Sequence, residues 1–322
     1  MAGLGEHITA LVQSHGSGDD ASFYAVALQV AAREARQGHH KLAGDIKKAV
    51  ELSRHSTPPT NVTRLLPPQG DLAELVVESH PQVGLRDLVL PLELTNQIKQ
   101  ILAEQRQRKS LVEHGYTPAH RLLLEGPPGT GKTMTAAVIA RELSLPLYTV
   151  RLDSLLSKFM GETASKLRVV FDSVASTRAV YLFDEFDALG GDRAGNDVGE
   201  ARRILNSFLV FLEQASPESV LIAATNHRSI LDKALFRRFD AVFTYELPDS
   251  KQAAAVVRAR LGSLAKGIRW PVIANHAQGL SHADLVKAAE GAAKATLMRG
   301  DSQVTSEDVV SALDARRAAS IA

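Results

Sequence analysis

The sequence predicts an α/β fold in which a parallel β-sheet carries helices on both faces, with helical parts before and after it. Three observations support this prediction. Short apolar runs alternate with longer helical patterns between residues 85 and 248, helical patterns alone follow residue 249, and residues 1–55 are also helical in pattern. Buried strands that alternate with helices are typical of parallel sheets covered on both faces.

The same patterns divide the chain into four expected parts. These are a helical module over residues 1–55, a Pro-rich linker over 56–84, a large α/β domain over 85–248 and a small helical domain over 249–322. The length of 322 residues fits two domains with a smaller appendage. Two Pro-Pro pairs without hydrophobic periodicity mark the linker.

Composition excludes several classes of protein. The chain is 45% hydrophobic and 23% charged, which argues against a disordered, collagen-like or coiled-coil chain. Because it has no cysteine, disulfides, thiolate metal sites and a cysteine nucleophile are excluded. The formal net charge of +1 argues against nucleic-acid binding through bulk charge. No apolar run is long enough for a transmembrane helix and the N-terminus lacks a signal-peptide pattern, so we expect a cytoplasmic protein without membrane insertion.

The expected elements follow from local periodicity. In the N-terminal module, an i, i+3, i+4 spacing places Phe23, Val26, Ala27, Val30 and Ala31 on one helix face. This module has few large side chains, so we expect it to pack against another body. Four short apolar or β-branched runs predict the strands of the large domain: Arg121–Glu125, Leu147–Leu152, Ala179–Phe183 and Val220–Ala224. Three Ala-rich amphipathic runs predict the C-terminal helices: Gln252–Leu264, Ser281–Arg299 and Ser306–Arg317.

A glycine-rich loop follows the first predicted strand and precedes a helical run that begins at Met134. It matches the G-x-x-x-x-G-K-[ST] pattern with Gly126, Pro127, Pro128, Gly129, Thr130, Gly131, Lys132 and Thr133. Glycines let successive backbone N–H groups surround phosphate oxygens, and the following helix adds the positive end of its dipole. We therefore expect residues 126–134 to bind ATP, with Lys132 at the β- and γ-phosphates and the Thr133 hydroxyl on Mg²⁺.

A second motif is the apolar run Val180–Phe183 followed by Asp184 and Glu185. The carboxyl end of a strand is where open α/β sheets bind ligands, so Asp184 is expected to hold the Mg²⁺ shell. Glu185 is expected to polarise the attacking water as a general base. Two carboxylates after a strand are common by themselves, and the glycine loop earlier in the chain is what favours the catalytic interpretation.

With these two motifs, the chain resembles an AAA+ ATPase of the AAA subgroup over about residues 85–315. The resemblance implies a P-loop NTPase sheet followed by a helical lid domain. Asn226 closes the strand from Val220, as the sensor 1 residue does in that family, and would orient the attacking water. The alternative is an asparagine that only caps a turn.

Residues Leu231–Asp240 resemble the segment that carries the arginine fingers of that family. Arg238 directly precedes Phe239-Asp240 and aligns with the second finger. Arg237 takes the first role only if the backbone shifts, because the two residues that usually separate the pair are missing. A finger acts on the γ-phosphate of the neighbouring subunit, which implies a ring. The alternative is a pair of surface arginines.

The sequence Phe159-Met160-Gly161 resembles pore loop 1, whose apolar side chains grip an extended polypeptide in the central channel. Methionine suits varied partners because its side chain is flexible and polarizable. Phe159 and Met160 packed beneath a loop are the alternative. A second channel loop is expected within residues 190–199, which are rich in glycine and charge.

The lid resemblance rests on Gly279-Leu-Ser-His-Ala-Asp-Leu285, which matches the sequence that opens a lid helix in the AAA subgroup. Gly279 and Ala283 are expected beside the adenine, with Asp87 and Leu88 on its other side. The region offers no sensor 2 arginine.

The resemblance implies an ATP-hydrolysing ring, expected to be a hexamer, that remodels, unfolds or threads a protein substrate. The N-terminal helices would recruit the substrate or a partner, and a subtilisin-like protease is one such partner. Two alternatives use the same scaffold. A nucleic-acid remodeller or loader predicts stimulation of the ATPase by DNA, and a nucleotide-gated scaffold predicts that Glu185→Gln retains biological activity without hydrolysis.

Overall fold

The computed structural model describes residues 70–155, 162–189, 198–227 and 233–321, together with scattered positions between Val26 and Lys48. The chain forms two compact units, Met1–Leu65 and Leu66–Ala322. In the first unit most described positions are helical, and Ala27, Ala31 and Ala43 are buried, as the helical spacing predicts for the first two of them. The expected pore residues Phe159, Met160 and Gly161, and residues 190–197 of the expected second loop, lie outside the described residues.

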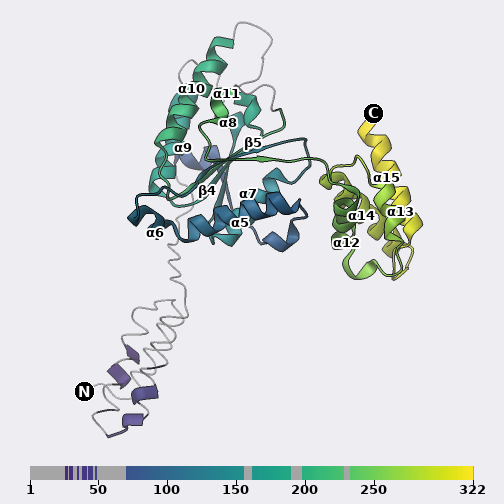
Figure 1. The fold of residues 1–322 in the computed structure, drawn as a ribbon, viewed down its shortest axis with the longest axis horizontal. Coiled ribbons are helices and arrows are strands. Elements are labelled where there is room, and N and C mark those ends of the chain that lie inside the picture. The colour runs from purple at the N-terminus through teal and green to yellow at the C-terminus, as the bar shows by residue number, and fades with distance from the viewer. Residues whose placement is uncertain are drawn as a thin grey trace. The chain divides into compact units, whose positions relative to one another are not determined.

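The second unit contains a six-stranded sheet in the order β1-β3-β4-β5-β2-β6. Figure 1 labels β4 and β5 of this sheet. The strands are β1 Val76–Ser79, β2 Arg121–Glu125, β3 Leu147–Val150, β4 Val180–Phe183, β5 Val220–Thr225 and β6 Ala241–Thr244. All neighbours pair in parallel except β1, which pairs antiparallel with β3. The predicted α/β class with a mainly parallel sheet is therefore confirmed.

Side chains of the central strands alternate between two cores, as the period of two in a strand requires. In β2, Leu122 and Leu124 face one core and Leu123 faces the other. The first core includes residues of α5 (Leu92–Arg106) and α7 (Lys132–Glu142). The second includes α9 (Glu162–Ser176) and α10 (Val198–Gln214), so helices cover both faces. The shorter helices are α4 Asp71–Leu75, α6 Arg108–Glu113, α8 Leu152–Leu155 and α11 Lys233–Phe236, and the 3₁₀ turns are Leu85–Asp87 and Phe186–Leu189.

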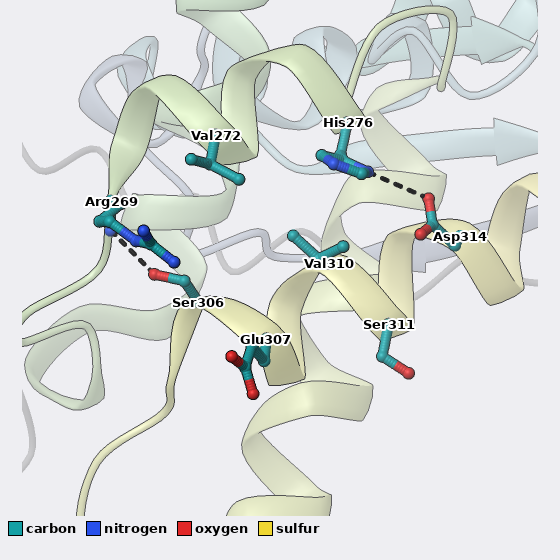
Figure 2. A pocket seen from close by; sticks show the side chains of 8 residues that line it. All are labelled: Arg269, Val272, His276, Ser306, Glu307, Val310, Ser311 and Asp314. Atoms are coloured by element: carbon teal, nitrogen blue, oxygen red, sulfur yellow. Dashed lines mark hydrogen bonds and ion pairs between the residues drawn. The ribbon is translucent and has the colours of Figure 1, made fainter.

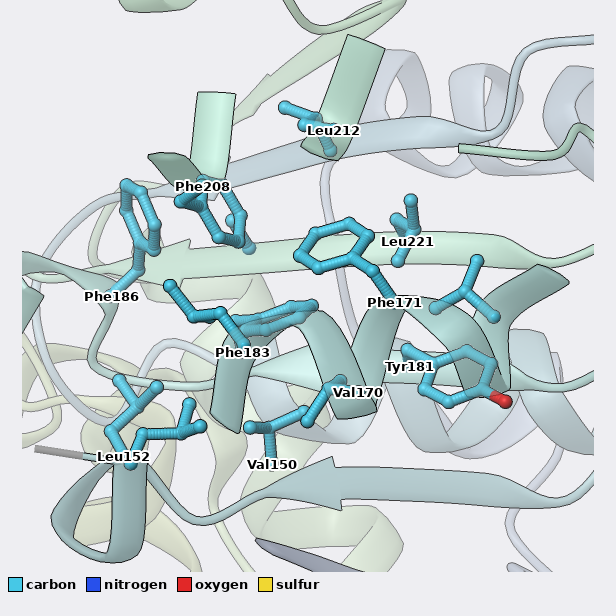
Figure 3. Packing of buried hydrophobic residues seen from close by; sticks show 14 of the residues in the cluster. Val150, Leu152, Val170, Phe171, Tyr181, Phe183, Phe186, Phe208, Leu212 and Leu221 are labelled. Atoms are coloured by element: carbon cyan, nitrogen blue, oxygen red, sulfur yellow. The ribbon is translucent and has the colours of Figure 1, made fainter. Parts of the chain in front are cut away.

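Aromatic side chains fill the core beneath α9 and α10 (Figure 3). The ring of Phe208 lies edge-on to Phe183, with centroids 5.0 Å apart, and 4.6 Å from Phe186. Phe183 and Phe186 flank Asp184 and Glu185 in the chain, and both are fully buried. Buried rings of this size contribute strongly to packing. They therefore fix the backbone on both sides of the two carboxylates.

The C-terminal part is entirely helical and has its own hydrophobic core. Its helices are α12 Ser250–Leu261, α13 Trp270–His276, α14 His282–Met298 and α15 Ser306–Ile321, with a 3₁₀ turn at Gly262–Leu264. Asp249 caps α12 by accepting a hydrogen bond from the Gln252 amide at 2.7 Å. All three predicted helical runs are confirmed, whereas α13 was not predicted. Among the described residues, no helix is both long enough and apolar enough to span a membrane.

The structure differs from the sequence prediction at the sheet edges. Residues 71–79, expected within the linker 56–84, form α4 and β1, and Val76 of β1 pairs with Val150 of β3. That part of the linker prediction is wrong. β6 was not predicted at all, and β3 ends at Val150 instead of Leu152. Both missed strands are edge strands with only one buried residue each, so they differ from the fully buried runs that predict the central strands.

Candidate functional site

The glycine loop connects the carboxyl end of β2 to the start of α7, as the sequence predicts. Its glycines adopt conformations that other residues rarely take. Gly126 has φ +144°, and a Cβ there would lie 2.2 Å from the carbonyl oxygen of Tyr245. Gly129 has φ +73°, and a Cβ there would lie 2.7 Å from Oγ of Ser281. Glycine is therefore required at these positions both by conformation and by contact.

Lys132 is the first residue of α7, and its side chain turns back over the loop. Its Nζ donates hydrogen bonds to the carbonyl oxygens of Gly126 at 2.7 Å and Pro127 at 2.8 Å. Burial lowers the pKa of Lys132, while the carboxylates of Asp184 and Asp187 act in the opposite direction. The ammonium group therefore lies between the loop and two acidic side chains, a position suited to contact with phosphate oxygens.

The loop meets the second motif through Thr133. Its Oγ1 donates a 2.6 Å hydrogen bond to Oδ2 of Asp184, which follows β4. Hydroxyl and carboxylate oxygens are ligands that Mg²⁺ prefers, so this pair fits a magnesium site. The neighbouring Glu185 is exposed and has φ +52°, which is unusual for a residue other than glycine. Its backbone amide donates a hydrogen bond to the other oxygen of Asp184 at 3.0 Å, so both oxygens of Asp184 accept hydrogen bonds.

Asp187 is a member of this cluster that the sequence analysis missed. Its Oδ1 accepts hydrogen bonds from Oγ1 of Thr225 at 2.9 Å and from the amide of Asn226 at 3.3 Å. The carboxylate therefore holds the end of β5 beside β4, and it also acts electrostatically on Lys132. The signal that could have revealed it in the sequence is a third acidic residue, three positions after Asp184.

The helical domain contacts the glycine loop directly. The backbone amide of Ala283 donates to the carbonyl oxygen of Gly129 at 3.0 Å. Ser281 caps α14 as predicted, because its Oγ accepts from the amide of Asp284 at 3.2 Å. The ring of His282 is 2.9 Å from the carbonyl oxygen of Val89 through Nε2, and burial lowers its pKa. The structure thereby brings the first turn of α14 beside the segment that was expected at the adenine.

For the other residues expected beside the adenine, the structure shows only contacts or turns within their own segments. Oδ2 of Asp87 accepts the amide of Gly84 at 2.7 Å, so this carboxylate stabilises its own 3₁₀ turn. Leu88 ends that turn, and its amide donates to Leu85. Gly279 has φ +79° and lies in the turn between α13 and α14.

The arginine segment lies near the amino end of β2, whereas the glycine loop lies at the carboxyl end of that strand. Asp240 accepts the backbone amide of Arg121, the first residue of β2, at 2.9 Å, and its other oxygen accepts from Nη2 of Arg121 at 2.6 Å. The glycine loop follows the last residue of β2. Five residues of strand span about 16 Å, so the structure does not bring Arg237 or Arg238 to the loop of the same chain.

The described residues also form a shallow groove of about 500 Å³ between α13 and α15 (Figure 2). Nδ1 of His276 lies 3.3 Å from Oδ1 of Asp314 at one end, and Ser306 accepts the amide of Arg269 at the other. None of the candidate site residues lines it. The described parts of the chain contain no group of three His, Cys, Asp or Glu side chains placed to hold a metal ion.

Comparison with known proteins points to the same region of the chain. Residues 122–247 match the family described as "ATPase family associated with various cellular activities (AAA)". A protein of Sinorhizobium fredii, described as "Uncharacterized AAA family ATPase y4kL", is 33% identical over 324 residues. That similarity covers 98% of this chain and 96% of the relative.

Two longer relatives are described as ATP-dependent zinc metalloproteases. FtsH 3 of Sphaerobacter thermophilus is 32% identical over 254 residues, which are 76% of this chain and 52% of that protein. FtsH of Aquifex aeolicus is 31% identical over 265 residues, which are 79% of this chain and 42% of that protein. This chain therefore spans about half, or less, of the length of these two metalloproteases.

Proposed function

Because this chain belongs to the AAA family of ATPases, we propose that it forms a ring in which each ATP lies between two copies, and that the ring remodels or threads a protein substrate. Family membership makes the chain a nucleotide-binding ATPase. The ring, its expected six copies and the protein substrate are the parts that we propose.

One copy supplies most of the catalytic groups in this proposal. Bound ATP with Mg²⁺ supplies the reactive γ-phosphoryl group. Lys132 exchanges its carbonyl partners for phosphate oxygens, and the amides of the glycine loop surround the phosphates. Thr133 and Asp184 would hold the Mg²⁺, and Asp187 holds the backbone amide of Asn226 at the end of β5. Glu185, whose side chain is exposed, would orient the attacking water.

The observation that carries the ring proposal is the position of the arginines. Arg237 and Arg238 follow α11 and precede β6, at the amino end of the strands, whereas the glycine loop is at the carboxyl end. A guanidinium at this edge reaches a phosphate only if that phosphate belongs to another copy. Repetition of the same contact in one direction produces a ring when the rotation between copies closes, and a closed ring is what we propose here.

The proposal of a protein substrate is supported by two observations. The Phe159-Met160-Gly161 sequence offers apolar contact that tolerates many polypeptides, between α8 and α9. The names of two relatives describe proteases that depend on ATP. We propose that this chain acts on polypeptides in the same general way, with a protease as a separate partner.

The test is the steady-state ATPase rate per subunit, measured against protein concentration, with Glu185→Gln as the control. We expect the rate to rise steeply with concentration, because the sites form between copies, and to vanish in the control. A rate per subunit that is independent of concentration down to monomeric protein would contradict the shared site.

The protein substrate needs a separate test. Phe159→Ala should slow unfolding of a tagged test protein much more than it slows ATP hydrolysis. Stimulation of the ATPase by DNA, with none by polypeptides, would instead favour the nucleic-acid alternative.

A further inference from the structure

The two adjacent arginines have different environments in the structure. The guanidinium of Arg238 forms an ion pair with the carboxylate of Glu213, in the last turn of α10. Arg237 is exposed, and its guanidinium forms no hydrogen bond or ion pair with the described parts of the chain. One guanidinium is therefore occupied within its own chain, while the other extends into solvent.

The backbone of Arg237 and Arg238 is anchored by the residues that precede and follow the pair. Leu235 before the arginines and Phe239 after them are buried in the core under α9 and α10. Asp240 accepts the amides of His120 and Arg121, at 3.0 and 2.9 Å. The arginines thus occupy a short turn between fixed points, and a contact that holds Arg238 also restrains the backbone from which Arg237 projects.

The charge pair itself contributes little stability. The side chains of Arg238 and Glu213 are 41% and 42% exposed, and ion pairs this exposed are screened by solvent. The negative end of the α10 dipole adds a further attraction for the guanidinium. A weak but directional contact of this kind determines position more than it determines stability.

We propose that Arg237 is the arginine that reaches the nucleotide of the neighbouring copy, and that Glu213 is a positioning residue that orients the turn by holding Arg238. This inference rests on the proposed ring. It differs from the sequence alignment, which favours Arg238 as the finger. An exposed guanidinium presents its donors to the γ-phosphate oxygens and stabilises the charge of the transition state.

The experiment measures ATPase rates of the full chain at saturating ATP and protein. Arg237→Ala and Arg237→Lys should each lower kcat by about 100-fold or more, because an ammonium does not replace the planar guanidinium. Arg238→Ala and Glu213→Gln should lower it less, and to a similar extent, and the double variant should be no worse than either. Arg238→Lys should recover much of the loss seen in Arg238→Ala, because an ammonium still pairs with Glu213.

A mixing experiment tests whether Arg237 acts between copies. We expect Arg237→Ala and Glu185→Gln subunits to have little or no activity alone, whereas a mixed ring contains some sites with an intact base and an intact arginine. In a random equal mixture about a quarter of the sites are complete, so we expect about a quarter of the wild-type rate. Sedimentation and the melting temperature of each variant verify assembly and folding.

Several results would overturn this inference while leaving the proposed function intact. These are near-normal turnover by Arg237→Ala together with inactive Arg238→Ala, an unchanged or faster rate in Glu213→Gln, and failure of the mixture to recover activity. Loss of assembly in Arg237→Ala would also overturn it, because the side chain would then be structural. A wild-type chain whose rate shows no dependence on assembly would instead remove the proposed ring, and this inference with it.

Discussion

The backbone amide of Ala283 donates a 3.0 Å hydrogen bond to the carbonyl oxygen of Gly129, so the first turn of α14 is bonded to the glycine loop. This contact joins the helical domain to the segment that is expected to hold the phosphates. A change in the position of α14 is therefore transmitted to the loop without any intervening side chain.

We predict that Gly129→Ala weakens nucleotide binding and lowers the melting temperature. The new methyl group would lie 2.7 Å from Oγ of Ser281 and 3.0 Å from Cβ of Ala283, so α14 must move away from the loop. Gly300→Ala is the matched control, because Gly300 has a similar φ of +83° with no atom within 4 Å of the added carbon. Binding of a fluorescent ATP analogue and thermal unfolding would distinguish the two. Equal loss of binding in both variants would mean that backbone strain alone is responsible.

The Thr133–Asp184 pair predicts a specific dependence on magnesium. Asp184→Asn removes the negative charge and one of the two carboxylate oxygens, and Thr133→Val removes the hydroxyl, so we expect the Mg²⁺ concentration for half-maximal ATPase to rise about 10- to 100-fold. Thr133→Ser, which keeps the hydroxyl, should recover most of that loss. Titration of the ATPase rate with MgCl₂ measures the effect. An unaltered magnesium dependence in Asp184→Asn would refute the assignment of this pair.

The backbone of Glu185 predicts an unusual result for glycine. At φ +52°, a residue with a Cβ is strained by about 1 kcal/mol, and glycine is not. Glu185→Gly should therefore be at least as stable as Glu185→Ala, although both lack the carboxylate and should not turn over ATP. At an ordinary helical position glycine is less stable than alanine by about 0.5–1 kcal/mol. Melting temperatures in that usual order would show that the strain is absent.

Buried histidines predict loss of stability in acid. Burial lowers the pKa of His120 and His282 below the ordinary 6.5, although Asp240 opposes this at His120. The unfolded chain therefore binds protons at a higher pH than the folded one, and the free energy of unfolding decreases as pH falls below 6.5. The slope is at most about 1.4 kcal/mol per pH unit for each histidine. Urea unfolding at a series of pH values measures it.

A variant separates the contribution of His282 from the others. His282→Gln cannot titrate, and its amide can still donate to the carbonyl oxygen of Val89, so the slope between pH 6.5 and 5 should become shallower. The carboxylate of Asp240 affects the free energy of unfolding at a lower pH than the histidines do. Burial by itself raises its pKa, but hydrogen bonds from Arg121 and from two backbone amides outweigh this and lower it below 3.8. Its contribution is thus complete above pH 3.8 and is lost as pH falls through the lower folded value. An identical slope in His282→Gln would exclude His282 as a source.

Local sequence patterns alone predict the strand-loop-helix unit around Lys132 and the strand that precedes Asp184. Local patterns are sufficient for these because the apolar runs are continuous and each polar residue comes at a fixed place after a strand. Parallel strands bring their carboxyl ends to one edge, so the meeting of Thr133 with Asp184 follows from the same patterns.

The contacts between distant segments become visible only in the folded structure. The pairing of Val76 with Val150, the bond from Ala283 to Gly129 and the ion pair of Arg238 with Glu213 leave no periodic signal in the sequence. Each joins residues that are far apart in the chain, and each depends on the packed orientation of whole elements. Asp187 lies between these cases: its place in the sequence is plain, but its role depends on the position of β5 beside β4. These contacts cannot be read from local patterns because they depend on backbone geometry and long-range packing.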